Sequence, residues 1–257
     1  MNKLSRRKLI ATGLATAAGA SGLAVANSLA HRYGLIPNGL IPPDDAGPYG
    51  VGETLTYAAQ RILTSHSMAR EFPPSAISKP PFANEVAPFS GEFKRLQAGG
   101  FADWRLAVDG MVARPASFSL TDLKAHPSRS QITHLACEEG WSYIAEWIGV
   151  PLSHILDVVG ILPHARYVVY FSIEPDWWDS VDMADALHPQ TLVTYGMNGG
   201  DLPVGHGGPL RLRVPRQLGY KNVKYITRLT VTDDLKQFGA GLGSASPEGG
   251  YAWYAGI

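Results

Sequence analysis

The one cysteine in the sequence lies where a thiol can point into a cavity. Cys137 ends a β-like apolar run over residues 131–137 and is followed by the polar, glycine-containing sequence Glu-Glu-Gly-Trp-Ser. A side chain at such a strand-to-loop junction is well placed to face a cavity. The alternative is structural, because an isolated cysteine most often fills an apolar site as a small buried group.

A second set of chemically active side chains lies in residues 206–225, HGGPLRLRVPRQLGYKNVKY. Glycines free backbone amides there, and five side chains donate hydrogen bonds: His206, Arg211, Lys221, Asn222 and Lys224. Such donors suit a phosphate group and a polar heterocycle. The alternative is a hairpin whose cations are solvated on its outer face.

Two aromatic clusters are further candidates. Residues 176–179 read Asp-Trp-Trp-Asp, and residues 251–254 read Tyr-Ala-Trp-Tyr. Such clusters most often pack in a core, but they can also line the mouth of a pocket.

The motifs that the sequence lacks exclude several classes of protein. One cysteine among 257 residues rules out an internal disulfide, a cysteine-ligated iron–sulfur cluster and a cysteine-rich zinc site. The sequence has no Cys-x-x-Cys-His for covalent haem, and its eight histidines form no His-x-His or His-x-x-x-His pair. A P-loop, a dinucleotide fingerprint and a Gly-x-Ser-x-Gly elbow are absent too, which argues against nucleotide binding and hydrolase chemistry.

The first thirty residues resemble a transport signal. The pair Arg6-Arg7 precedes a mildly apolar run over residues 9–30, which is typical of a twin-arginine export signal. The alternative is a transmembrane anchor, although Gly, Ser and Thr dilute the run. Small residues allow cleavage after Ala26 or Ala30. We expect the twin-arginine translocase to deliver the protein to the periplasm, with an uncleaved membrane tether as the alternative.

The charge balance changes once residues 1–30 are set aside. The whole chain has 22 basic and 22 acidic residues, and the first thirty contain four basic groups and no acid. The remainder therefore has a net charge of −4. This balance gives no support for a nucleic-acid partner. Because the twin-arginine route carries folded proteins, often with a cofactor already inserted, we expect a buried cofactor.

Strand and helix patterns alternate irregularly, which favours an α+β fold. We expect an extended Pro/Gly-rich arm over 31–80, with one helix at 53–65, before the main domain at 81–257. Strand patterns occur at 104–110, 131–137, 165–173, 191–199, 209–215 and 223–233, and short helices at 119–125, from Pro151 and at 182–187. Ser119 and Asp122 predict a capping box at the start of the first of these helices.

Four segments of the chain together resemble the molybdopterin-binding domain of the sulfite oxidase family: Cys137 with the Glu-Glu-Gly-Trp-Ser that follows it, DALHPQTLVTYGMNG, HGGPLR and GYKNVK. The similarity runs from about Phe82 to Thr232. It implies a mixed, β-rich domain with a molybdenum–molybdopterin cofactor, in which one cysteine thiolate binds the metal. A soft thiolate suits that role, which the resemblance assigns to Cys137 as catalytic residue and metal ligand.

The resemblance also implies which residues bind the pterin and its phosphate: His206, Arg211, Asn222, Val223 and Lys224. The first two belong to a His-Gly-x-Pro-x-Arg motif, and the last three are expected to approach the pterin through backbone and side chain. Two further cofactor-binding residues, Asn84 and Ser172, rest on weaker matches.

The same resemblance implies an oxidoreductase similar to the small bacterial catalytic subunits of this family, without a haem-binding or an immunoglobulin-like domain. Some of these subunits reduce methionine sulfoxide and others oxidise sulfite. We expect oxygen-atom transfer on a small or protein-bound S-oxide substrate, because Glu138 and Glu139 beside Cys137 would repel sulfite. Sulfite dehydrogenase and a non-catalytic binding protein of the same fold are the alternatives.

Electrons must be exchanged with a separate protein, because the sequence cannot hold an iron–sulfur cluster or a covalent haem. A membrane haem subunit or a cytochrome would serve as that partner. The chain itself is expected to be a monomer.

Overall fold

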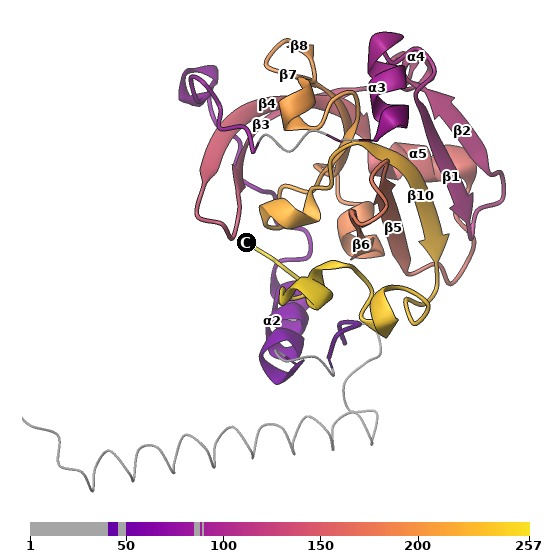
Figure 1. The fold of residues 1–257 in the computed structure, drawn as a ribbon. Coiled ribbons are helices and arrows are strands. Elements are labelled where there is room, and N and C mark those ends of the chain that lie inside the picture. The colour runs from indigo at the N-terminus through magenta and orange to yellow at the C-terminus, as the bar shows by residue number, and fades with distance from the viewer. Residues whose placement is uncertain (1–40, 46–49, 85–87, 89) are drawn as a thin grey trace, which may run out of the picture.

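The computed structural model describes residues 41–45, 50–84, 88 and 90–257. The expected export signal over 1–30 and the first part of the arm, 31–40, lie outside the described residues. Within the described part, two five-stranded sheets and short helices form the β-rich α+β fold that the sequence predicts (Figure 1).

One sheet has the strand order β2 (Ala116–Ser119), β1 (Arg105–Gly110), β10 (Ile226–Thr232), β5 (Tyr167–Ser172) and β6 (Trp178–Asp182). Strands β1 and β10 are parallel, and the other neighbours are antiparallel. Because β5, β6 and β10 are neighbours, the loops that follow β5 and precede β10 lie at one end of this sheet.

The second sheet consists of β3 (Arg129–Ala136), β4 (Ser142–Pro151), β7 (Leu192–Met197), β8 (Gly200–Asp201) and β9 (Arg211–Arg213). Strands β3 and β4 form an antiparallel hairpin, and β7 pairs with β4, β8 and β9. Cys137 begins the turn of the hairpin, where its backbone N–H donates to the carbonyl of Trp141 at 3.0 Å. The sheet therefore fixes the position of the cysteine.

The α-helices are α2 (Gly50–Leu63), α3 (Gly91–Ala98), α4 (Leu120–Ala125), α5 (Leu152–Val159) and α6 (Met183–Ala186). Short 3₁₀ turns are η2 (Pro74–Ala76), η3 (Val204–His206), η4 (Gly219–Lys221), η5 (Gly239–Gly241) and η6 (Ser246–Gly249). Helix α2 and the C-terminal residues lie side by side, below the two sheets in the view of Figure 1. Both sheets and α5 contribute to the largest apolar core, for example through Val108, Val150, Ile155 and Leu229.

Most predicted elements are confirmed, including the capping box in which Ser119 and Asp122 bond to each other's backbone. The sequence interpretation missed β4, whose buried positions alternate with partly buried ones. Alanine and glycine weaken its strand signal, yet a Cβ at Gly149 would lie 2.3 Å from the carbonyl oxygen of Val193, so close pairing with β7 requires glycine. Pro151 ends β4 and caps α5 instead of starting the helix.

Helix α2 confirms the helix predicted at 53–65 but turns its apolar side outward. Leu55, Ile62 and Leu63 are 55%, 65% and 77% exposed, whereas Arg61 is buried. Its guanidinium contacts the carboxylates of Asp182 and Asp185, each at 2.7 Å. Because separating such a buried ion pair is costly, these contacts decide which side of the helix faces the domain.

Candidate functional site

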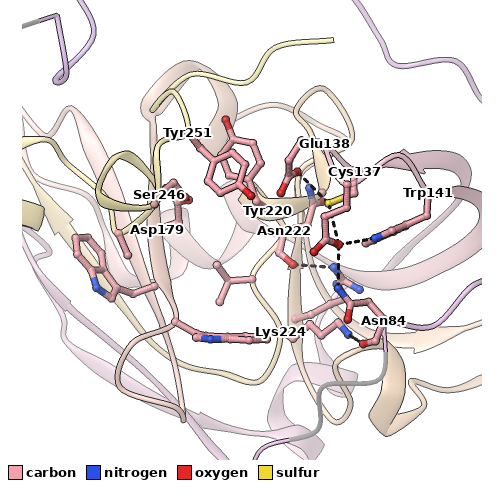
Figure 2. A pocket seen from close by; sticks show the side chains of 18 of the residues that line it. Asn84, Cys137, Glu138, Trp141, Asp179, Tyr220, Asn222, Lys224, Ser246 and Tyr251 are labelled. Atoms are coloured by element: carbon pink, nitrogen blue, oxygen red, sulfur yellow. Dashed lines mark hydrogen bonds between the residues drawn. The ribbon is translucent and has the colours of Figure 1, made fainter. Parts of the chain in front are cut away.

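The cavity beside Cys137 has a volume of about 540 Å³ and brings together residues from distant parts of the chain (Figure 2). Seven of the eight residues that the sequence predicts for the site line it: Asn84, Cys137, His206, Arg211, Asn222, Val223 and Lys224. Six of these seven come from three segments: Cys137 directly follows β3, His206 ends η3 and Arg211 begins β9, and residues 222–224 directly follow η4. One ligand could therefore contact all of these segments.

The thiol of Cys137 is partly buried at the edge of the cavity. Burial, and then the hydrogen bond that the thiol donates to Glu138 Oε2 at 2.9 Å, raise the pKa of Cys137 to about 12. The free thiol is therefore protonated at neutral pH. A positively charged metal ion beside Sγ would favour the thiolate instead.

Arg211 is a buried cation with unused donor capacity. Its two terminal nitrogens donate to the carbonyls of His206 and Asn222, each at 2.7 Å, and its guanidinium lies 5.2 Å from the ring centroid of Trp147. Its Nε finds no acceptor within the described part of the chain. Burial lowers the pKa of Arg211. An anionic ligand would stabilise this cation, because both of its hydrogen-bonded acceptors are neutral.

Lys224 and His206 share this environment. Lys224 donates to the carbonyl of Asn84 at 2.5 Å and to that of Gly205 at 2.7 Å. Burial, and then the positive charge of Arg211, lower the pKa of Lys224 to about 7. Burial, followed by Arg211 and Lys224, lowers the pKa of His206 to about 4. A phosphate among these groups would favour their charged forms, so the basic side of the cavity suits an anion.

The Asn222 side chain holds its own loop together. Its Oδ1 accepts from Arg213 Nη1 and from the backbone N–H of Val214, both at 2.7 Å, and its Nδ2 donates to the carbonyl of Leu218 at 2.8 Å. These bonds occupy the amide that the resemblance expects to reach a pterin. Asn222 is thus presented to the cavity chiefly through its backbone.

The two residues predicted from weaker matches, Asn84 and Ser172, differ in their position relative to the cavity. Asn84 lines the cavity, and its Nδ2 donates to Glu139 Oε2 at 3.2 Å. Ser172 ends β5 and does not line the cavity. Its hydroxyl accepts from the backbone N–H of Glu174 at 3.2 Å, and its own N–H donates to the carbonyl of Trp177 at 2.8 Å. The structure therefore places Ser172 behind the turn that carries Trp177, where it supports that turn.

Acidic and aromatic residues form the facing wall. Residues 176–179 all line the cavity, as does Tyr251, which confirms part of the expectation for the two aromatic clusters. Trp177 and Tyr251 are each 40% exposed, so they lie at the mouth. Trp253 and Tyr254 instead are buried and pack against Tyr57 of α2.

Several lining residues escaped the sequence interpretation: Trp141, Tyr143, Gly219, Tyr220, Ala245, Ser246 and Gly249. Trp141 and Tyr220 belong to the motifs EEGWS and GYKNVK, so their position next to predicted site residues could have identified them as lining residues. The residues of 245–249 carry no such signal, because tertiary contacts alone bring them to the cavity.

These donors fit a molybdopterin. A single thiol faces the same cavity as a basic side with an orphaned Arg211 Nε, which matches a metal held beside a phosphate-bearing heterocycle. No three His, Cys, Asp or Glu side chains of the described residues gather into a metal site of their own. A metal bound here would therefore depend on ligands that the pterin supplies.

Residues 94–238 match the family described as oxidoreductase molybdopterin binding domain, which is more than half of the chain. The chain therefore belongs to this family. It is a molybdopterin-dependent oxidoreductase of the sulfite oxidase type, as the sequence motifs predict.

Two relatives are named as parts of protein-methionine-sulfoxide reductases. The name of YedZ1 from Azospira oryzae assigns it to such an enzyme as a subunit; it is 38% identical over 195 residues, 76% of this chain and 70% of that protein. MsrP from Ralstonia nicotianae, named as the catalytic subunit, is 34% identical over 145 residues, 51% of this chain and 44% of that protein. The chain thus spans less than half of the length of MsrP.

The crystal structure of the sulfane dehydrogenase SoxCD from Paracoccus pantotrophus shares the fold, with a TM-score of 0.51 and 22% identity over 66% of this chain and 46% of that one. Among the described residues, no helix has the length and apolar character needed to cross a membrane.

Proposed function

We propose that this protein is the catalytic component of a periplasmic molybdenum enzyme that removes the oxygen atom from an S-oxide substrate. The observation that carries the proposal is the shared cavity, in which Cys137 faces the same space as Arg211 and Lys224. In the net reaction a sulfoxide, two electrons and two protons give a thioether and water. When bound, the molybdenum centre supplies this two-electron oxygen-atom chemistry.

The chain's own residues hold the cofactor. Cys137 provides the thiolate ligand, and its position is set by the β3–β4 hairpin. Arg211 and Lys224 neutralise the phosphate of the pterin, while His206, neutral at pH 7, offers a ring nitrogen that can donate or accept a hydrogen bond. Asn222 and Val223 line the same space.

The carboxyl and aromatic groups that line the cavity support a neutral substrate over sulfite. Asp176, Glu138 and Glu139 bring carboxyl groups to the cavity, and Trp177 and Tyr251 bring aromatic surface to its mouth. Carboxylates repel the sulfite dianion, whereas a sulfoxide carries no net charge and its alkyl groups gain from contact with aromatic rings. The names of the two relatives point to the same class, a methionine sulfoxide in a protein.

Electrons reach the site from a separate redox protein, such as a membrane haem subunit or a cytochrome. The sequence has one cysteine and no Cys-x-x-Cys-His motif, so it holds no cluster or covalent haem of its own. The names of both relatives contain the word subunit, which agrees with an enzyme built from more than one protein. Arg6-Arg7 and the apolar run after them support export of the folded monomer to the periplasm.

Two assays on the molybdenum-loaded protein test the direction and the substrate. Reduced viologen with methionine sulfoxide measures reduction, and ferricyanide with sulfite measures oxidation. We expect turnover in the first assay and at least about tenfold less in the second. Turnover with sulfite alone would make the protein a sulfite dehydrogenase. Loaded protein without turnover in either assay would identify a binding protein that has kept the fold.

A further inference from the structure

Two carboxyl groups from the N-terminal part of the described chain are buried beneath the C-terminal segment. Asp44 is 3% exposed and Glu53, in the first turn of α2, is 5% exposed. Asp44 Oδ2 accepts from the backbone N–H of Trp253 at 2.8 Å, and Glu53 Oε1 accepts from the N–H of Tyr254 at 2.7 Å. The two side chains thus hold consecutive residues of the C-terminal segment.

Each of the two carboxyl groups has one oxygen left without a donor. Asp44 Oδ1 and Glu53 Oε2 are buried and find no donor among the other described residues, while the two side chains are within hydrogen-bonding reach of one another. Two ionised carboxylates in this arrangement would repel strongly, and one proton between them turns the repulsion into a hydrogen bond. One proton on the pair would therefore stabilise this arrangement.

The charged and titratable groups around this pair come from neighbouring elements. Lys221 of η4 faces Glu53, and it is fully buried in an ion pair with Asp179 of β6. Tyr220, also of η4, lies close enough to feel the charges of both carboxyls. Because Asp179 already neutralises Lys221, that cation is not available to balance a second negative charge on the pair.

The segment held by the pair continues directly into the cavity wall. Tyr251 and Ser246 line the cavity, and Tyr251 lies two residues before Trp253. The hydroxyl of Tyr220 donates to the carbonyl of Ala252 at 2.7 Å, and the rings of Tyr220 and Tyr251 lie 5.2 Å apart. Ser246 Oγ donates to Asp179 at 2.7 Å. Asp44 and Glu53 therefore anchor the C-terminal end of this segment, while the contacts of its other residues lie beside the cavity.

We propose that Asp44 and Glu53 are positioning residues that share one proton and thereby hold residues 245–254 as a wall of the cavity. Loss of the proton places two negative charges in a buried site and loosens the wall. This arrangement involves only the chain's own residues, so it does not depend on the identity of the substrate.

The pH dependence has a definite sign. Burial, together with the hydrogen bond to Asp44, raises the pKa of Glu53 to about 8 from an ordinary value of 4.5. The folded protein then binds a proton that the unfolded chain releases between these two values. Stability from this pair is fully present below about pH 4.5 and is lost as the pH rises to about 8.

The test compares the full chain with its Glu53→Gln variant, in which the amide can donate to Asp44 without a titrating proton. We expect the Tm of the wild type to fall by about 5 °C or more relative to the variant between pH 5 and pH 8. Over the same range, the protection of residues 245–252 against hydrogen exchange, corrected for the intrinsic rise of the exchange rate with pH, should fall in the wild type and stay constant in the variant. Asp157→Asn, which removes an exposed carboxyl, is the control and should keep the wild-type behaviour.

A Glu53→Gln variant with the wild-type pH dependence of Tm would overturn the shared proton. Protection of residues 245–252 that falls equally in both proteins after the same correction would overturn the link to the wall. If Glu53→Gln fails to fold, Asp44→Asn tests the same bond, because a neutral partner removes the like charge and the difference in Tm between pH 5 and pH 8 must shrink.

Discussion

Gly219 packs directly against Cys137. A Cβ added at position 219 would lie 3.0 Å from both Cβ and Sγ of the cysteine, closer than side-chain carbons normally approach. Turn η4, which begins at Gly219, therefore reaches the base of the thiol, and the residues that follow, Asn222 to Lys224, are brought to the same cavity. The absence of a side chain at one position thus links the proposed metal ligand to the proposed pterin loop.

This contact predicts that Gly219→Ala forces the turn and the thiol apart. Overpacking of this kind costs about 1–3 kcal/mol, so the Tm should fall by roughly 3–10 °C, and the molybdenum content should fall with it. Gly91→Ala is the matched control, because a Cβ there meets nothing within 4 Å. A Gly219→Ala protein with full stability and metal content would show that the close contact is not needed.

The basic side of the cavity predicts anion binding by the cofactor-free protein. Sulfate, whose charge is constant near neutral pH, should bind more weakly at pH 8.5 than at pH 6, because Lys224, with a pKa of about 7, loses its charge between these values. Lys224→Met should weaken binding at pH 6 about tenfold and remove most of the pH dependence. Isothermal titration calorimetry measures both effects.

The control for this prediction is Lys236→Met, since Lys236 is exposed and does not line the cavity. Equal sulfate affinity in the wild type and Lys224→Met would contradict the assignment of Lys224 to the anion.

Sequence reasoning found the parts of the site that sit in continuous motifs. Cys137 and His206 each carry a local pattern, and the structure brings both to one cavity. Ser172 was predicted from a weaker match to the family at the end of a strand, but the neighbours of such a residue depend on the turn that follows, and the Ser172 hydroxyl bonds to that turn. The place of residues 245–249 in the wall could not be predicted, because tertiary contacts put them there: Ser246 bonds to Asp179, and the N-terminal segment holds Trp253 and Tyr254.

Contacts between distant residues also limit what the sequence predicts about the fold. Periodicity predicted helix α2, but not that Arg61 would anchor its polar side to Asp182 and Asp185 and leave Leu55 and Ile62 exposed. Hydropathy assigns an apolar side to the core by default, and a buried ion pair with residues more than a hundred positions away overrides that default.

The aromatic mouth predicts a selective effect on substrate binding. Trp177→Ala and Tyr251→Ala should each raise the KM for a methionine sulfoxide peptide about tenfold with little change in kcat, because the proposed substrate would contact these exposed rings outside its reacting atoms. Leu187→Ala, an exposed apolar side chain away from the cavity, should leave KM unchanged. An equal fall in kcat for both aromatic variants would indicate a different role.

The acidic wall predicts a charge-dependent change of preference. Asp176→Lys replaces a negative by a positive charge at the cavity, so kcat/KM for sulfite with ferricyanide should rise a few-fold, while reduction of a neutral sulfoxide should change by less than about twofold. The gain should diminish at high ionic strength. A sulfite rate that is insensitive to this substitution would remove the electrostatic argument for an S-oxide substrate.

The most direct test of the whole account is the molybdenum content of the folded chain, measured by mass spectrometry for the wild type and Cys137→Ser. We predict one molybdenum per wild-type chain and a near-complete loss in Cys137→Ser, with the fold retained because the thiol is only partly buried. Equal molybdenum in both proteins, or a wild type that folds in a molybdenum-replete cell without the metal, would contradict the assignment of Cys137 as the ligand.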